Sequence, residues 1–208
     1  MNVFKMSLFY APISPVKNER GQTITPASLY PSKALTVEEV YKLITTDKSL
    51  CKLTEIVRAA AGNDKEFRAM KQQCLPYVTP CGTFTYRKSD HLLVPSGLVV
   101  VDIDHLDSHA EATSLRRKLF DDKFLRPSLV FVSPSGRGVK AFVPYDLHRI
   151  PDIKQNISEN IYWVMNYVQL TYGDSDSPAK DKGVDTSGKD VVRACFLSYD
   201  KGALFRRS

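Results

Sequence analysis

Two aspartates end an apolar run in the sequence. The stretch GLVVVDIDHLD, residues 97–107, places four apolar residues directly before Asp102 and Asp104. Residues two apart on a strand point to the same face, so the two carboxylates should project together while Ile103 packs behind them. Carboxylates that close repel each other, and one would hold a proton unless a divalent cation neutralised both. Oxygen ligands at this low number suit Mg²⁺ or Mn²⁺, with space left for phosphate oxygens.

The position of this pair also favours a binding role, because α/β sheets bind ligands at the carboxyl ends of their strands. The alternative is that Asp102 and Asp104 are solvated residues at a strand end, or that they cap a turn. A single DxD pattern does not decide between these interpretations.

A second group of residues has the chemistry of an anion site. In VFVSPSGRGVKAFV, residues 130–143, a strand enters a Ser- and Gly-rich turn and the chain returns as a strand. Glycines let backbone amides approach an anion, hydroxyls donate hydrogen bonds, and basic side chains supply charge. The pattern is not a Walker loop, because GxxxxGK[ST] is absent and a strand follows. A plain glycine hairpin is the alternative, and the candidate phosphate ligands are Ser133, Ser135, Gly136, Arg137, Gly138 and Lys140.

A third group lies near the end of the chain, in GVDTSGKDVVRACFLSYD, residues 183–200. Asp185 would complete a two-metal site if it met Asp102 and Asp104. Arg193 would steady phosphate charge. Considered alone, an aspartate such as Asp185 is more often a turn residue, and an arginine in a strand such as Arg193 is more often an ion-pair partner than a phosphate ligand.

The elements that must position these groups follow an α/β order without repeats. Capping-box patterns at Thr36 with Glu39 and at Asn63 with Glu66 predict helix starts. Apolar residues at helical spacing predict a long helix over 153–172, packed on the sheet. We expect further helices over about 49–61 and 110–120, a loop leading into a strand or hairpin over 75–88, and strands over 3–10, 98–104, 128–133, 139–145 and 191–199.

Composition bounds the class of protein. The chain has 208 residues, of which 43% are hydrophobic and 25% are charged, as in an ordinary globular protein. The net charge of +6 favours a polyanionic partner such as nucleic acid or nucleotide phosphate, although solubility alone would explain it. No run of eighteen apolar residues and no secretory signal pattern occurs, so we expect a cytoplasmic protein without a membrane partner. The four cysteines show neither zinc-site nor disulfide spacing and are expected to be reduced, mostly buried thiols.

Together, the three groups resemble the archaeo-eukaryotic primase, or primase-polymerase, superfamily. The segments LPYVTPCGTF, VVVDIDHLD, VSPSGRGVKAFV and DVVRACFLSYD look closest to the VirE N-terminal type domain of Bacteroidetes and phage-like elements. The resemblance covers about residues 36–200. It implies an α/β (α+β) catalytic core with an RRM-like sheet unit and a smaller α/β unit, over residues 35–208, after an N-terminal strand and loop over 1–34.

By this resemblance Asp102, Asp104 and Asp185 match the catalytic metal ligands, and the turn from Ser135 to Lys140 matches the nucleotide-phosphate motif. Most of the superfamily has His where this chain has Lys140. Lysine keeps a positive charge for phosphate but does not titrate near neutral pH.

The expected function is a metal-dependent nucleotidyltransferase acting in DNA replication of a bacterial or mobile-element system. Its cofactor would be Mg²⁺ or Mn²⁺, and its partners an NTP or dNTP, a single-stranded DNA template, and a helicase or further primase domain. A catalytically silent module that binds single-stranded nucleic acid or nucleotides is the second interpretation. A phosphatase of the haloacid dehalogenase type is disfavoured, since Leu106 stands where that class has Thr or Val.

Overall fold

The structure is a computed structural model, and it describes residues 4–173, 183–184 and 190–207. The helices are α1 (Val37–Thr46), α2 (Lys48–Ala59), α3 (Asp64–Cys74), α4 (His109–Asp121) and α5 (Ile153–Tyr172), with a 3₁₀ turn at Ser89–His91. The strands are β1 (Lys5–Phe9), β2 (Val16–Lys17), β3 (Thr23–Thr25), β4 (Lys33–Thr36), β5 (Tyr77–Thr79), β6 (Gly82–Phe84), β7 (Leu92–Pro95), β8 (Leu98–Asp104), β9 (Leu129–Val132), β10 (Val139–Pro144), β11 (Gly183–Val184), β12 (Cys195–Phe196) and β13 (Leu204–Phe205).

Two sheets form the framework, and their paired strands run antiparallel. The larger sheet has five strands in the order β11-β8-β10-β9-β13, and the smaller has four in the order β12-β5-β1-β4. Two short hairpins, β2-β3 and β6-β7, stand apart from these sheets. The mixed α and β composition that the sequence predicts is confirmed. Strand β1 lies inside the smaller sheet, between β4 and β5.

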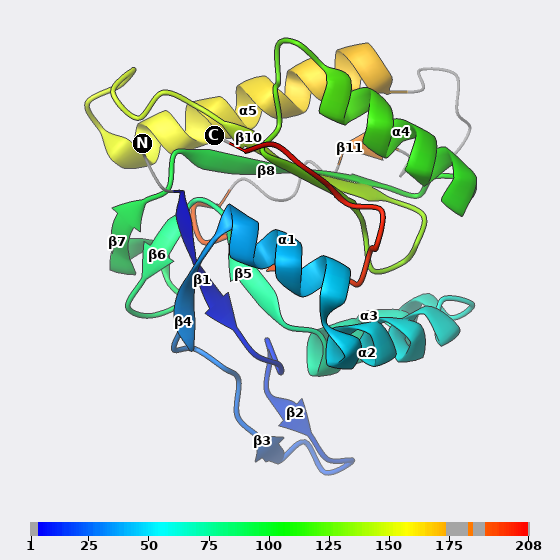
Figure 1. Cartoon of the computed structure of the whole chain (residues 1–208). Coiled ribbons are helices and arrows are strands. Elements are labelled where there is room, and N and C mark those ends of the chain that lie inside the picture. Colours follow the sequence, from blue (N-terminus) through cyan, green and yellow to red (C-terminus); the bar gives the residue numbers. More distant parts are fainter. Residues whose placement is uncertain (1–3, 174–182, 185–189, 208) are drawn as a thin grey trace.

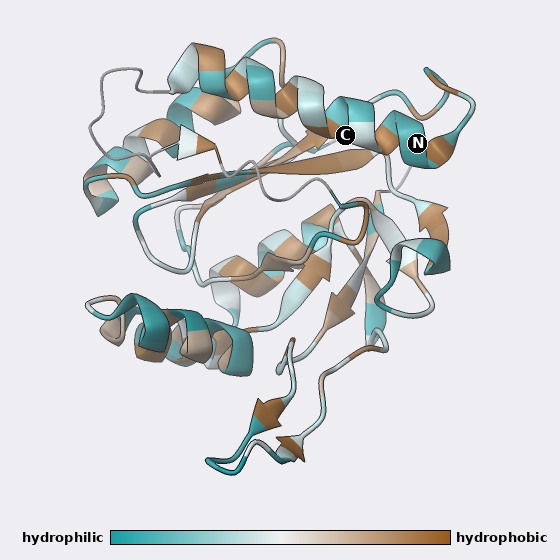
Figure 2. Ribbon diagram, turned by 180° about the vertical axis from the view of Figure 1, so that it is seen from behind, coloured by the Kyte–Doolittle hydropathy of each residue, from teal (hydrophilic) through white to brown (hydrophobic). Residues whose placement is uncertain are grey.

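The larger sheet is covered on both faces (Figure 1). Helices α4 and α5 pack on one face, where Val99, Val101 and Ile103 of β8 enter one core cluster. The smaller sheet and α1 pack on the other face, where Leu98 and Val100 enter a second cluster. Figure 2 shows hydrophobic strands between helices in which hydrophobic and hydrophilic residues alternate. The alternation along β8 therefore directs Asp102 and Asp104 toward the interior between the two sheets.

The helix starts follow the predicted capping chemistry. Thr36 Oγ1 accepts from the Glu39 amide, and the Glu39 carboxylate accepts from the Thr36 amide, which completes a capping box at α1. Asn63 Oδ1 accepts from the Glu66 amide at the start of α3. Helix α5 has the predicted bounds and buries its apolar stripe against β8, with Ile157, Ile161, Val164, Met165 and Val168 in the core.

One predicted strand is much shorter than expected. The segment 191–199 reads as a strand, but only Cys195 and Phe196 pair with β5. After β12, the amides of Leu197, Tyr199 and Asp200 donate to Pro76 O, Thr54 Oγ1 and Ile44 O respectively. The Leu197 bond continues the register with β5, whereas Tyr199 and Asp200 donate to α2 and α1, so the ladder ends before them.

The four cysteines are free thiols, as expected, with Cys81 and Cys195 buried and Cys51 and Cys74 partly exposed. Burial raises the pKa of Cys81 and of Cys195 to about 12, so both stay protonated at neutral pH. Across the residues that the structure describes, no helix has both the length and the apolar character needed to span a membrane.

Candidate functional site

The two aspartates of β8 lie at its carboxyl end on the inner face of the larger sheet. Asp102 is 9% exposed and Asp104 is partly buried. Leu98 and Val100, on the same face of the strand, are almost completely buried. Strand β8 is antiparallel to its neighbours. The rule that ligands bind at the carboxyl ends of strands, which holds for parallel α/β sheets, therefore does not explain a site at this end of β8. The burial of two acidic side chains on an otherwise apolar face makes this end of β8 the candidate site.

Strand β10 brings Lys140 directly opposite Asp102. The two residues are register partners in the β8-β10 ladder, so their side chains project from the same face. The Lys140 ammonium donates to Asp102 Oδ2, and both side chains are about nine-tenths buried. Burial alone would lower the pKa of Lys140, but the charge of Asp102 raises it above its ordinary value, so the lysine is charged.

Arg193 approaches the same carboxylate from the segment that precedes β12. Its Nη2 atom lies 3.6 Å from Asp102 Oδ2, and its side chain is 12% exposed. Asp102 Oδ1 is buried and has no hydrogen-bond partner among the described residues. One oxygen of Asp102 thus has two cationic neighbours while the other remains unsatisfied, which is uncommon for a buried carboxylate.

Asp104 is in an environment that disfavours its charge. Burial and the neighbouring charge of Asp102 raise the pKa of Asp104. Gly138, at the start of β10, lies directly against it: a Cβ there would fall 2.7 Å from Asp104 Oδ1 and 2.7 Å from Ser133 Oγ. Glycine is therefore required at this position for the second motif to approach β8 so closely.

The serine- and glycine-rich turn does reach the two aspartates, but its amides are used internally. The Gly136 amide donates to Ser133 O, and the Arg137 amide donates to Ser135 Oγ. The Ser133 and Ser135 hydroxyls lie 3.0 Å apart. In this conformation the Gly136 and Arg137 amides are therefore engaged within the turn, and the role of the turn in binding phosphate stays a prediction. Arg137 is exposed, whereas Ser133, Gly136 and Gly138 are buried.

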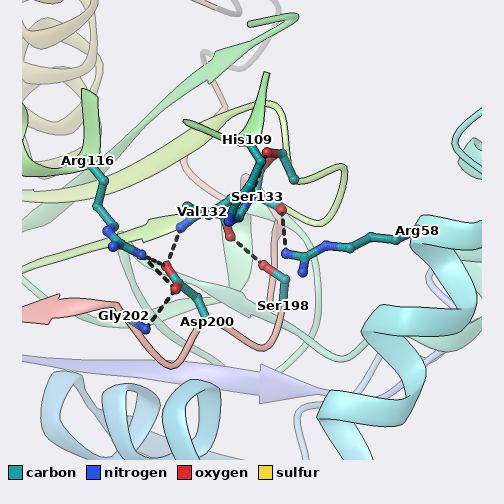
Figure 3. Close-up of polar contacts among 9 residues, drawn as sticks. Arg58, His109, Arg116, Val132, Ser133, Ser198, Asp200 and Gly202 are labelled. Atoms are coloured by element: carbon teal, nitrogen blue, oxygen red, sulfur yellow. Dashed lines mark hydrogen bonds and ion pairs between the residues drawn. The ribbon is translucent and has the colours of Figure 1, made fainter. Parts of the chain in front are cut away.

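Two helices hold this turn from outside, as Figure 3 shows. Arg58 of α2 donates through Nε to Pro134 O at 3.2 Å and through Nη2 to Ser133 O at 3.5 Å. His109, at the start of α4, places Nδ1 3.1 Å from Gly136 O. The geometry of the turn thus depends on residues far from it in sequence.

Asp200 fixes the strand that leads into the turn. Its carboxylate accepts from Arg116 Nη1 at 2.7 Å and from the Val132 amide at 2.8 Å (Figure 3). Ser198 donates to Val132 O at 2.7 Å. The segment DVVRACFLSYD, singled out for Arg193, therefore also anchors β9 beside the second motif.

Lys71 of α3 is the site residue that the sequence reading missed. The charges of Lys140, Asp104 and Asp102 all act on it, and burial, followed by the charge of Lys140, lowers its pKa. Its ammonium lies 5.5 Å from the centre of the Phe67 ring and 5.4 Å from that of Phe196. A single lysine in a helix of mixed polarity cannot be recognised from the sequence as a residue of a binding site. Asp102, Asp104, Lys71, Lys140 and Arg193 are called the charge cluster below.

The third predicted metal ligand, Asp185, lies outside the described residues. Strand β11 ends at Val184 and pairs with β8, with Gly183 opposite Asp104 and Val184 opposite Ile103. Within the described residues, no group of three or more His, Cys, Asp or Glu side chains is placed to hold a metal ion.

These features define a mixed α/β protein with a charge cluster enclosed between two antiparallel sheets. Residues 69–205 match the protein family described as BT4734-like, N-terminal domain. The match covers more than half of the chain, and the protein therefore belongs to this family. A search of curated proteins and a search of solved structures each found no match.

Proposed function

We propose that this protein is a metal-dependent nucleotidyltransferase of the primase-polymerase type. The observation that carries the proposal is the meeting of Asp102 and Asp104 with Lys140, Ser133 and Arg193 at one end of β8. Three separate stretches of sequence, each chosen for its chemistry, supply these five residues. Cationic side chains bind the phosphates of a nucleoside triphosphate, and carboxylates bind its metal ion. The charge cluster offers both kinds of group.

The donor set fits a divalent cation. Asp102 Oδ1 is buried without a partner, and burial next to Asp102 raises the pKa of Asp104. A cation held between the two carboxylates would give Asp102 Oδ1 a partner. It would also reduce the repulsion between Asp102 and Asp104 that raises the pKa of Asp104. When bound, such an ion supplies Lewis-acid activation of an attacking hydroxyl and neutralises charge on the phosphates.

In the proposed reaction, the oxygen of a 3′-hydroxyl forms a bond to the α-phosphorus of an NTP or dNTP, its proton is released to water, and the bond between the α-phosphorus and the pyrophosphate oxygen breaks. Asp102 and Asp104 would hold the metal ion, which would neutralise phosphate charge. Lys140 and Arg193 hold phosphate charge, and Ser133 and Ser135 present hydroxyls to the same region. The Lys140 ammonium has three N–H donors, so it can contact Asp102 and a phosphate together. For turnover, the Asp102–Lys140 pair must loosen enough for Asp102 to bind the metal ion.

A catalytically silent nucleotide-binding or single-stranded nucleic-acid-binding module is the second candidate. It is favoured by one observation, the ion pair in which Lys140 already engages Asp102. If this pair persists when a nucleotide binds, Asp102 remains neutralised by lysine and the site binds phosphate without turnover.

Incubation of the protein with Mn²⁺, labelled NTPs or dNTPs and single-stranded DNA separates the two candidates. We expect template-dependent synthesis of labelled products longer than one nucleotide. Binding of nucleotide without incorporation, over the same range of Mn²⁺ and protein concentrations, would support the silent module and contradict the transferase.

A further inference from the structure

A row of aromatic rings lies on the outer surface of the protein, on the helix-covered side of the larger sheet. Helices α4 and α5 form the layer on this side, as Figure 1 shows. Helix α5 carries Trp163 and Tyr167 one turn apart, and their rings stack with centroids 5.6 Å apart. The ring of Phe124, in the turn after α4, lies 6.1 Å from that of Tyr167. Phe124, Tyr167 and Trp163 are called the aromatic row below.

The fold holds the aromatic row at the surface. Phe124 is 79% exposed and Trp163 is 46% exposed, whereas Leu125, next to Phe124, is buried. Asp122 fixes the turn, because its Oδ1 atom accepts from the amides of Phe124 and Leu125. Its Oδ2 atom accepts from the Tyr167 hydroxyl at 3.0 Å, which ties the turn to α5. Exposed aromatic rings that adjoin one another and are held in place in this way are typical of an interaction surface.

Basic side chains adjoin the aromatic row. Lys118 lies in the last turn of α4, and Lys123 and Arg126 flank Phe124 in the chain. All three side chains are exposed, and none of them forms an ion pair in the part of the chain that the structure describes. Their charges are therefore available to an anionic partner.

Acidic residues near the row already have partners. Asp121 pairs with Arg117 at 2.6 Å, and Glu159, one turn before Trp163, lies 3.7 Å from Arg149. Flat rings bordered by unpaired cations match single-stranded nucleic acid, whose bases stack on aromatic side chains and whose phosphates bind Lys and Arg. Lysine is depleted in protein–protein interfaces, so the same border disfavours a protein partner.

We propose that the aromatic row is a contact surface for single-stranded nucleic acid, separate from the charge cluster. Bases stack on Phe124 and Trp163, and the three basic side chains beside the row bind phosphates. This surface shares the single-stranded partner of the proposed function, but it needs neither a metal ion nor a nucleotide. It is therefore compatible with the transferase and with the silent module.

The fluorescence of Trp163 tests the proposal directly, because Trp163 is the only tryptophan of the chain. Titration with a short single-stranded oligothymidylate, at low salt and without metal or nucleotide, should quench this fluorescence as bases stack. An abasic oligonucleotide of the same length carries the same phosphates and should leave the fluorescence unchanged.

Phe124→Ala should weaken oligothymidylate binding by about 5- to 100-fold, the effect of one lost stacking contact. Its high exposure makes the substitution tolerable to the fold, which thermal unfolding checks. Tyr30→Ala is the matched control: Tyr30 is 73% exposed between β3 and β4, so this variant should bind as the parent does.

The dependence of binding on salt tests the basic border of the row. Lys123→Met should lower the affinity and reduce the slope of log affinity against log salt by about 0.7, the contribution of one phosphate contact on a single strand. Lys17→Met, at an exposed position of the β2-β3 hairpin, is the control and should retain the parent's slope.

The proposal is overturned if oligothymidylate does not quench Trp163, if the abasic oligonucleotide quenches it equally, or if Phe124→Ala binds as tightly as the parent. Self-association that Phe124→Ala abolishes, with unchanged oligonucleotide binding, would assign the row to a protein interface instead. The proposed function fails separately. Binding that depends on the aromatic row, in a protein that never incorporates nucleotides, would support this surface and exclude the transferase.

Discussion

Asp104→Asn is expected to reduce Mn²⁺-dependent nucleotide incorporation by about 100-fold or more, because it removes one charged metal ligand with almost no change of volume. Asp104 is the more informative of the two aspartates. Burial and Asp102 raise its pKa, so its charge is unfavourable in the folded protein. Removing that charge should leave the protein at least as stable at neutral pH, and loss of activity would then not reflect unfolding.

The incorporation assay should include two further variants. Asp102→Asn should also abolish activity, but it takes a carboxylate from Lys140 and is expected to destabilise the fold. Asp107→Asn removes an exposed carboxylate three residues beyond Asp104 and should retain the parent's activity. If Asp104→Asn incorporates nucleotides at the parent's rate, Asp104 is not a catalytic metal ligand.

Lys140→Met is expected to lower the free energy of unfolding by about 3 to 5 kcal/mol, the usual effect of breaking a buried ion pair from one side. The Lys140 and Asp102 side chains are only 7% and 11% exposed, so solvent cannot replace the lost partner. Urea unfolding followed by circular dichroism measures the change.

The double variant Lys140→Met with Asp102→Asn should recover most of that stability, since neither member of the pair then carries a charge. Lys42→Ala is the control for a surface pair: Lys42 and Glu38 are 65% and 49% exposed, and their separation should change stability by less than about 0.5 kcal/mol. A Lys140→Met protein as stable as the parent would mean that Asp102 does not depend on Lys140 as its partner, contrary to the buried pair seen in the structure.

The parts of the fold that sequence predicted well are those in which one periodicity dominates. Strand β8 is a continuous apolar run, and α5 repeats apolar residues at helical spacing, so both were predicted with their observed bounds. The segment 191–199 alternates like a strand, but its pairing with β5 does not extend beyond Leu197, because the amides of Tyr199 and Asp200 donate to Thr54 Oγ1 and Ile44 O.

The candidate site was predicted only where its residues belong to compact motifs. Asp102 was predicted on a strand over 98–104 and Lys140 on a strand over 139–145, and the ladder places the two residues opposite each other. Arg58 could not be found in this way, because it contacts Pro134 across 76 residues from within an ordinary helix. The same is true of Lys71. No spacing rule connects a helix face to a turn that only the folded chain brings near it.

The central claim is that Asp102 and Asp104 together bind a divalent cation in the presence of a nucleotide. Mn²⁺ binding measured by electron paramagnetic resonance, with and without dNTP, tests it most directly. The account predicts that the parent binds Mn²⁺, that dNTP tightens this binding, and that Asp104→Asn weakens it by about 10-fold or more. Equal Mn²⁺ affinity in the parent and in Asp104→Asn, with no effect of dNTP on either, would contradict the claim.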